Sequence, residues 1–264
     1  MYFDFYGLKS SPFNITADPH LFFESSSHKE ALEVLLFGIK QKKGIMLVVG
    51  EVGTGKTTLC KTLISKLPAG IKTSLILNPY FSDVQLLQAI VSDFGLKIIK
   101  KTRLDIINTL NAFLLEVNAG GNTAVLIIDE AQNLTSRQLE QIRLLSNLET
   151  SSEKLLQIIL VGQPELIDKL KKFNLRQIYQ RIIIKHNLLP LKEEEVKEYI
   201  NFRLSKSGAN IVIEPSSYKL IYEFSKGIPR LINALCDRAL LCGYVKEKRI
   251  FDEEIFKACI EELK

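Results

Sequence analysis

Up to Leu188, apolar residues along the chain follow two alternating patterns. Short apolar runs predict five strands, at residues 45–49, 73–77, 124–128, 155–161 and 182–188. Helical spacing between these runs predicts helices at residues 59–67, 84–94, 104–117 and 138–148. The run 124–128 is apolar at every position, which is typical of a parallel strand buried on both faces. The alternation predicts an α/β fold with a parallel, doubly wound sheet.

The pattern changes at Leu189-Pro190. From Lys192 onward only helical spacing occurs, which predicts helices at residues 195–204, 215–224, 231–243 and 252–263. The stretch Gly227-Ile228-Pro229-Arg230 interrupts two of these helices. We therefore predict two domains: residues 1–189, an N-terminal arm with the α/β core, and residues 190–264, a small all-helical domain.

Composition adds only broad limits. With 264 residues, of which 46% are hydrophobic and 25% charged, the chain can form one large or two smaller globular domains. Its 35 basic and 30 acidic residues give a net charge of +5, too small by itself to indicate nucleic-acid or membrane binding. The four cysteines lack metal-site spacing and lie among apolar residues, so we expect buried thiols in a reducing compartment. Neither a signal peptide nor a long apolar run occurs, which predicts a cytoplasmic protein without a membrane span.

Residues 50–57, Gly-Glu-Val-Gly-Thr-Gly-Lys-Thr, lie between a predicted strand and a predicted helix. This order forms an anion cradle, because the loop N–H groups point inward and the helix dipole adds positive charge. Lys56 can reach the β- and γ-phosphates, and the Thr57 hydroxyl can ligate Mg²⁺. We therefore predict that the chain binds a nucleoside triphosphate. The residues predicted to contact it are Gly50, Glu51, Val52, Gly53, Thr54, Gly55, Lys56, Thr57 and Thr58.

An acidic pair follows the apolar run 124–128. Asp129 and Glu130 stand where the carboxyl end of that strand is expected, the edge at which open α/β sheets bind ligands. Asp129 is predicted to hold Mg²⁺, and Glu130 to accept a proton from an attacking water. Gln163 follows the run 155–161 and is expected at the same edge, where its amide either orients the water or the γ-phosphate or is only part of a turn.

Residues 1–27 are rich in aromatic side chains and turn residues without helical spacing. We expect this arm to pack over a domain, either through packing alone or beside a bound base. Ser27 is predicted to cap the helix that follows. His28 is expected to be solvated at the start of that helix, with a contact near the adenine as the alternative.

Taken together, these residues resemble the AAA+ ATPases. The resemblance rests on the phosphate loop, the acidic pair and the stretch 227–230. Within that superfamily the chain is similar to the general secretion pathway protein A (ExeA-like) group and more distantly to transposition ATPases of the MuB and TniB kind. The stretches that carry the closer resemblance are residues 5–8, 12–13, 129–132, 144–149, 162–166 and 180–182.

The resemblance implies roles for three further residues and completes the expected fold. Gln163 would sense the γ-phosphate, and Arg230 would touch the nucleotide from a helical lid domain. Arg181 would be the finger offered to a neighbouring subunit's nucleotide, with Arg176 as the second choice and a local salt bridge as the alternative role for Arg181. The fold expected from the resemblance is a P-loop AAA+ core followed by a small all-helical lid.

The function expected from the resemblance is that of an ATP hydrolase that uses Mg²⁺ and acts as an oligomeric switch, in rings or filaments, on a partner complex related to secretion. The alternative is an ATP-dependent regulator of transposition that binds double-stranded DNA, with Lys97, Lys100 and Lys101 and the lysines at 169, 171 and 172 facing the duplex. A small-substrate kinase is a weaker alternative. Similar proteins often continue into a membrane span and a peptidoglycan-binding domain, so we expect this chain to be a stand-alone or truncated ATPase module.

Overall fold

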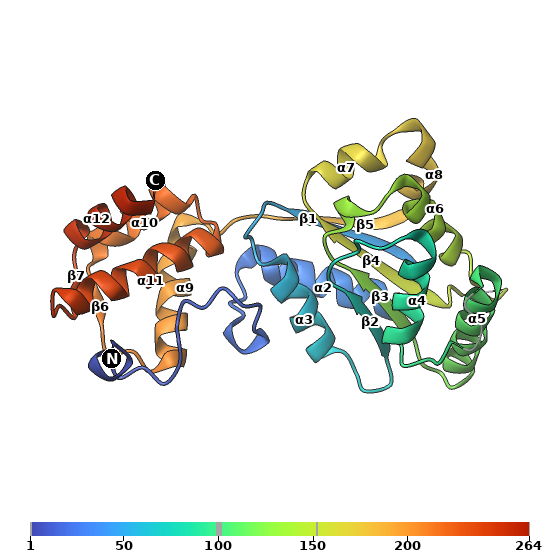
Figure 1. Ribbon diagram of the computed structural model, residues 1–264, viewed down its shortest axis with the longest axis horizontal. Coiled ribbons are helices and arrows are strands. Elements are labelled where there is room, and N and C mark those ends of the chain that lie inside the picture. Colours follow the sequence, from blue (N-terminus) through green and yellow to red (C-terminus); the bar gives the residue numbers. More distant parts are fainter. Residues whose placement is uncertain (1, 99–101, 152, 264) are drawn as a thin grey trace. The chain divides into compact units, whose positions relative to one another are not determined.

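The computed structural model describes residues 2–98, 102–151 and 153–263 (Figure 1). Contacts divide these residues into two compact units. One comprises residues 30–52 and 56–188, and the other comprises residues 2–29, 53–55 and 189–263. We predicted a boundary near residue 189 with the arm on the side of the α/β core, whereas the contacts group the arm with the C-terminal helices.

The first unit is built on a five-stranded parallel sheet (Figure 1). Its strands are β1 (Ile45–Gly50), β2 (Lys72–Ile76), β3 (Ala124–Ile128), β4 (Leu156–Gly162) and β5 (Ile182–Leu188). They lie in the order β2-β3-β4-β1-β5. Every residue of β1, β3 and β4 is buried, because these central strands are covered on both faces. The two edge strands alternate between buried and more exposed positions. The predicted α/β fold with a parallel sheet is confirmed.

Helices cover both faces of this sheet (Figure 1). On one face, Leu47, Leu126 and Ile158 share a hydrophobic core with the helices that cover it. Met46 points to the opposite face, where a side chain added at Gly38 would collide with its sulfur. The helices of this unit are α2 (Ser26–Lys40), whose first turn belongs to the other unit, α3 (Lys56–Lys66), α4 (Asp83–Asp93), α5 (Arg103–Ala119), α6 (Ser136–Leu145), α7 (Glu165–Leu170) and α8 (Arg176–Gln180), with 3₁₀ turns η2 (Ala131–Asn133) and η3 (Phe173–Leu175).

The cap of α2 differs from the prediction. The helix begins at Ser26, and the Ser25 hydroxyl accepts the hydrogen bond from the His28 N–H at 3.3 Å. Ser27 instead accepts a hydrogen bond from the Leu189 N–H at 3.0 Å. The prediction of Ser27 as the cap was wrong because three consecutive serines offer equivalent capping side chains, and only the backbone geometry selects among them.

The second unit packs the N-terminal arm against the C-terminal helices. Its elements are α1 (Tyr2–Tyr6), η1 (Pro19–Leu21), α9 (Glu193–Ser207), β6 (Val212–Ile213), α10 (Pro215–Ser225), α11 (Pro229–Val245), β7 (Ile250–Phe251) and α12 (Glu253–Leu263). The Tyr6 ring is fully buried, and its hydroxyl donates to the Leu240 carbonyl at 3.0 Å. Arg203 of α9 holds the arm through the carbonyls of Pro12 and Asn14.

We predicted an entirely helical C-terminal region, but the structure also contains two short strands there. β6 and β7 form a two-stranded parallel sheet, in which Val212 pairs with Ile250 and Ile213 with Phe251. Strands of two residues are too short to show a period of two, which is why the sequence pattern did not reveal them. Among the described residues, no helix combines the length and the apolar character that crossing a bilayer requires.

Candidate functional site

The loop between β1 and α3 has the backbone shape that its glycines predict. Gly53 and Gly55 lie in the left-handed region, with φ of +84° and +97°. Space at these positions is also restricted: a Cβ at Gly53 would lie 2.7 Å from the Arg230 Cβ, and one at Gly55 would lie 3.0 Å from His28 Nε2. These two positions therefore require glycine for both reasons. Thr54 between them is buried, whereas Glu51 and Val52 are exposed.

His28 holds this loop and is not solvated as predicted. The residue is only 4% exposed. Nε2 lies 3.0 Å from the Thr54 carbonyl oxygen, and Nδ1 lies 2.6 Å from the Ser25 hydroxyl. The pair of contacts fits an Nε2–H that donates to Thr54 and an Nδ1 that accepts from Ser25. Sequence reasoning missed this role because the histidine stands far from the loop along the chain.

Lys56 and Thr57 open α3, directly after the glycine turn. The Lys56 ammonium is buried and donates to the carbonyls of Gly50 at 2.8 Å and Glu51 at 2.9 Å, so it lies over the inside of the loop. The Thr57 hydroxyl donates to Asp129 Oδ2 at 2.5 Å. The structure thus brings together the lysine, the threonine and the aspartate that the sequence assigned to one site. Thr58 follows in the first turn of α3 and is half-buried.

Asp129 stands at the carboxyl end of β3 and is 1% exposed. Its Oδ1 accepts the Glu130 N–H at 2.9 Å. Burial raises the pKa of this carboxyl above its ordinary value, and the hydrogen bonds from Thr57 and Glu130 oppose that effect. The Thr57 and Asp129 oxygens are the hard ligands that Mg²⁺ prefers. Within the described ranges, no group of three or more His, Cys, Asp or Glu side chains could hold a metal, so phosphate and water oxygens would complete a Mg²⁺ shell here.

Glu130 follows with a left-handed backbone, at φ 51° and ψ 37°. This conformation is uncommon for a residue with a side chain and carries a free-energy cost of about 1–3 kcal/mol. Along an extended strand, Asp129 and Glu130 would point to opposite faces. The left-handed conformation of Glu130 ends that alternation, and the η2 turn begins directly after it. Both carboxyl groups therefore lie at the same edge of the sheet.

Two glutamine amides hold the Glu130 carboxylate. Gln132 Nε2 donates to Glu130 Oε2 at 2.5 Å, and Gln163 Nε2 donates to the same oxygen at 3.4 Å. The Gln132 side-chain oxygen, Oε1, accepts the Gln163 backbone N–H at 3.2 Å, which connects the ends of β3 and β4. A Cβ at Gly162 would lie 2.8 Å from that oxygen, so Gly162 gives this contact its space. The sequence placed Gln163 near Glu130, but it gave no role to Gln132.

Arg181 lies at the other edge of the sheet. In the parallel pair β1 and β5, Ile45 is opposite Ile182 and Gly50 is opposite Leu188. Arg181 therefore stands at the amino edge, about 20 Å along the strands from the phosphate loop. Its guanidinium donates to Asn147 Oδ1 and, at 3.3 Å, to the Ser146 hydroxyl. We gave a local salt bridge as the alternative role for Arg181. The guanidinium does have local partners, but they are neutral groups and not carboxylates. The guanidinium of Arg176, the second choice for a finger, lies 4.4 Å from the centre of the Phe173 ring.

Arg230 is the second residue of α11 and is exposed. Its backbone N–H donates to the Gly53 carbonyl at 3.2 Å, within the unit that includes residues 53–55. The predicted lid arginine is thus attached to the phosphate loop through its backbone. The backbone contact does not involve the guanidinium, and the nucleotide contact that we predicted for the guanidinium stays a prediction.

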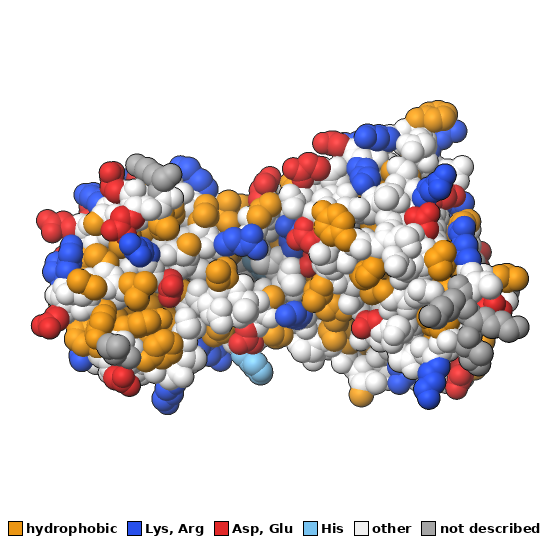
Figure 2. Space-filling view, in the orientation of Figure 1, with side chains coloured by type: hydrophobic (Ala, Val, Ile, Leu, Met, Phe, Trp, Pro, Cys, Tyr) orange, Lys and Arg blue, Asp and Glu red, His pale blue; other side chains and the backbone are white. Residues whose placement is uncertain are grey.

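The lysines considered for DNA binding do not form one free group. Lys169 donates to the carbonyls of Gln132 and Leu134 and so supports the η2 turn. Lys97, Lys171 and Lys172 are exposed. Lys100 and Lys101 lie outside the described residues. On the face seen in Figure 2, basic and acidic side chains alternate over the surface of the α/β unit.

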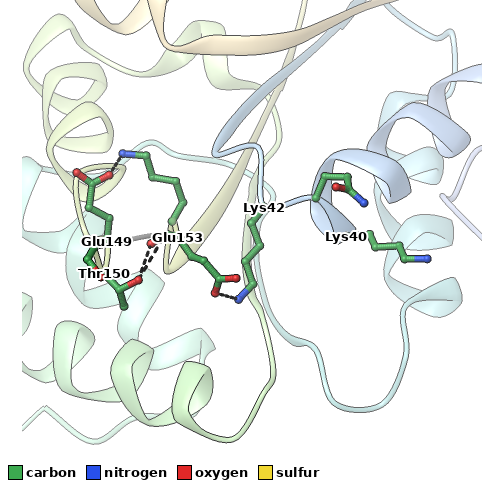
Figure 3. A pocket seen from close by; sticks show the side chains of 8 residues that line it. Lys40, Lys42, Glu149, Thr150 and Glu153 are labelled. Atoms are coloured by element: carbon green, nitrogen blue, oxygen red, sulfur yellow. Dashed lines mark hydrogen bonds and ion pairs between the residues drawn. The ribbon is translucent and has the colours of Figure 1, made fainter.

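A pocket of about 480 Å³ lies at the amino edge (Figure 3). The Lys42 ammonium lies 2.5 Å from a Glu153 oxygen, and Lys154 is paired with Glu149. The remaining lining residues include Lys40. Because four of its charged side chains are paired with one another, this pocket is a weaker ligand site than the carboxyl edge.

Comparison with known proteins identifies the class. Residues 39–170 of this chain match the AAA domain family. The chain belongs to that family, which places it among the P-loop AAA+ ATPases and confirms the predicted resemblance. Over 248 residues it is 42% identical to general secretion pathway protein A of Aeromonas hydrophila. That alignment covers 93% of this chain and 45% of the relative, so the chain spans about half the length of the protein it matches.

Solved structures confirm the predicted AAA+ fold. The ADP form of the ORC2 protein of Aeropyrum pernix matches with a TM-score of 0.73 and 17% identity, covering 97% of this chain and 73% of that one. The Holliday junction branch migration motor RuvB of Thermotoga maritima matches with a TM-score of 0.61 and 21% identity, covering 92% and 70%. At these identities the matches establish the fold alone.

Proposed function

We propose that the chain hydrolyses ATP at the carboxyl edge of the sheet and acts as an oligomeric switch on a partner complex related to secretion. The observation that carries the proposal is the Glu130 carboxylate, held by Gln132 and Gln163 beside the Thr57–Asp129 pair. The similarity to general secretion pathway protein A supports the link to secretion.

The phosphate loop would bind the triphosphate. Its N–H groups and the first turn of α3 supply partial positive charge, and Lys56 would exchange its contacts with the carbonyls of Gly50 and Glu51 for phosphate oxygens. His28 holds the Thr54 carbonyl and so keeps the loop in its left-handed shape. Because the backbone of the loop is preorganised, it needs little reorganisation when the substrate binds.

Thr57 and Asp129 would hold Mg²⁺, which supplies neutralisation of charge on the β- and γ-phosphates when it is bound. Glu130 would accept the proton of the attacking water. Both amide donors reach Oε2, and among the described residues no protein donor reaches Oε1, which leaves Oε1 as the acceptor of that proton. Gln163 links Glu130 to the end of β4 and would report the presence of the γ-phosphate.

Assembly would add one more group to the site. From the amino edge Arg181 cannot reach the phosphates of its own subunit, because the length of the strands separates them. In a ring or filament it would serve the nucleotide of a neighbouring subunit, while Arg230 would contact the nucleotide from the C-terminal helical domain. We propose residues 190–264 as that lid domain.

The DNA-binding alternative, a transposition regulator of the MuB or TniB kind, has weaker support. It relies on basic side chains that face the duplex, but Lys169 supports the η2 turn and is not available for DNA. Lys97, Lys171 and Lys172 remain as exposed contacts for a phosphate backbone. Retention of duplex DNA that depends on both nucleotide and salt would favour this alternative. The kinase alternative is disfavoured by membership in the AAA family.

The variant Glu130→Gln tests the proposed chemistry. It keeps the shape and hydrogen-bonding atoms of the side chain but removes the base. We expect ATP affinity within about twofold of wild type and a loss of turnover of about 10²–10⁴. Glu116→Gln, an exposed change on α5, is the matched control and should leave turnover unchanged. Normal hydrolysis by Glu130→Gln would remove Glu130 from the mechanism.

A further inference from the structure

A second pocket, of about 560 Å³, lies between α4, α5, α6 and η3 and shares no residue with the proposed ATP site. Its size falls within the range of sites that bind small molecules. The lining residues are Asp83, Arg103, Ser136, Arg137, Glu140, Gln141, Leu144 and Asn174.

Gln141 gives this pocket an unusual feature. The residue is 3% exposed, and neither its amide nitrogen nor its amide oxygen has a hydrogen-bond partner in the described protein. Buried side-chain amides are nearly always paired, because an unpaired one loses its bonds to water without replacement. The amide offers one donor and one acceptor side by side, so it suits a group that presents the same two functions, such as a peptide unit.

The surroundings favour an anion beside that peptide unit. Asp83, Arg103 and Ser136 are the first residues of α4, α5 and α6, so three helix N-termini meet at the pocket. Each of these termini carries partial positive charge. Arg103 and Arg137 make no ion pair or side-chain hydrogen bond with the rest of the described chain.

The two acidic residues of the lining do not cancel this charge. Glu140 is held by Arg143 through bonds of 2.7–2.9 Å, and this pairing lowers the pKa of the Glu140 carboxyl. Asp83 therefore balances only one of the two remaining guanidinium groups. Leu144 adds an exposed apolar contact at the end of the same face of α6.

We propose that this pocket binds an extended peptide segment of a partner protein that presents one acidic side chain. The backbone N–H and C=O of the segment pair with the Gln141 amide, and its carboxylate is bound by Arg103 and Arg137. A phosphate group of DNA would leave the Gln141 oxygen without a donor, and a row of phosphates would meet Asp83. The occupant is therefore a peptide and not a nucleic acid.

The test follows the side-chain amide of Gln141 by NMR in the full chain, with its signal assigned by its loss in Gln141→Leu. The probe is the capped tripeptide Gly-Glu-Gly, and the matched probe is capped Gly-Gln-Gly, which lacks the charge. We expect a saturable shift with the first at millimolar concentrations and binding weaker by roughly tenfold with the second. Arg137→Ala should weaken binding by a similar factor, whereas Gln177→Leu, on the exposed face of α8, should not.

Gln141→Leu should abolish binding of the tripeptide while melting at or above the temperature of the wild type, because it removes an unpaired buried amide. If that variant does not fold, the test rests on Arg137→Ala, and unchanged binding of Gly-Glu-Gly by Arg137→Ala would contradict the proposal. Three results would overturn the proposal: no shift of the Gln141 signal by either peptide, an equal shift by acetate, which would leave an anion site only, or a shift by duplex DNA in place of the peptide.

Discussion

The two edges of the five-stranded sheet both carry charged side chains, but they hold them in different ways. At the amino edge several charged side chains are partly exposed and paired with opposite charges, as in Lys42 with Glu153. At the carboxyl edge Asp129 is buried, and Asp129 and Glu130 receive their hydrogen bonds from a hydroxyl, a backbone N–H and two amides. Exposed pairs contribute little free energy, whereas the hydrogen bonds from Thr57 and Glu130 to the buried Asp129 carboxyl oppose the rise in its pKa that burial causes.

Arg181 lies at the amino edge and donates to neutral groups there, and its replacement gives the largest expected effect. Under the proposed function, Arg181→Ala leaves ATP binding intact but lowers turnover in the assembled state by about 10³–10⁵, the range seen for a guanidinium supplied in trans in GTPases. Turnover per subunit of the wild type should rise with protein concentration. Lys43→Ala, which removes another cation at the same edge, should change neither value.

Mixing two inactive variants separates a role in trans from a local one. Arg181→Ala keeps its phosphate loop, and Lys56→Ala keeps its finger. Mixed assemblies should recover activity at interfaces that pair the intact loop with the intact arginine. If assemblies shown to be mixed stay inactive, the arginine acts within its own subunit through Asn147 and Ser146.

Arg230→Ala tests how far the carboxyl edge depends on the C-terminal helices. Loss of a charged hydrogen bond to phosphate should lower turnover by about 10- to 100-fold. It should also abolish the protection that ATP gives to residues 190–264 against limited proteolysis. If ATP still protects these residues in the variant, Arg230 does not couple the C-terminal helices to nucleotide binding. The matched control is Arg249→Ala, whose guanidinium donates to the Phe5 carbonyl within the same unit.

Gln132→Ala tests whether neutral groups at the carboxyl edge position the base. The change removes the shorter of the two bonds to Glu130 and the bond to the Gln163 N–H. We expect kcat to fall about tenfold with little change in KM, because the proposed base is still present but loses its orientation. Asn133→Ala, the neighbouring amide, is the control. A rise in KM with constant kcat would instead place Gln132 in substrate binding.

The smallest effect is expected at the paired charges of the amino edge. Glu153→Gln removes the partner of Lys42, and both side chains are partly exposed. The free energy of unfolding in urea should change by less than about 1 kcal/mol, and the difference should shrink further as salt is added. A loss of several kcal/mol would show that this edge depends on its ion pairs more than the comparison implies.

The sequence predicted the parts of the fold that depend on burial and on glycine. The runs 124–128 and 182–188 match β3 and β5 in their bounds, and the glycine turn has the left-handed residues expected of it. Strand order placed Gln163 beside Glu130, as expected from parallel strands that end at one edge. The catalytic roles assigned to these residues remain predictions.

The missed features depend on contacts that have no period along the chain. Gln132 contacts the Glu130 side chain next to the left-handed turn at Glu130, and a rare φ value there has no sequence signature. His28 reaches Thr54 across the fold, and the serines before it gave no reason to prefer one cap. The short strands β6 and β7 were missed because each has only two residues.

The strand order also has a consequence for how the chain is made. β1 lies between β4 and β5, so Ile45 finds its partners only at Ile158 and Ile182. A nascent chain that leaves the ribosome from its N-terminus therefore contains the whole phosphate loop long before either neighbour of β1 exists. Until Leu188 has been synthesised, at least one edge of this apolar strand is open to wrong partners. The strand that carries the nucleotide loop is thus among the last parts of its sheet to be completed.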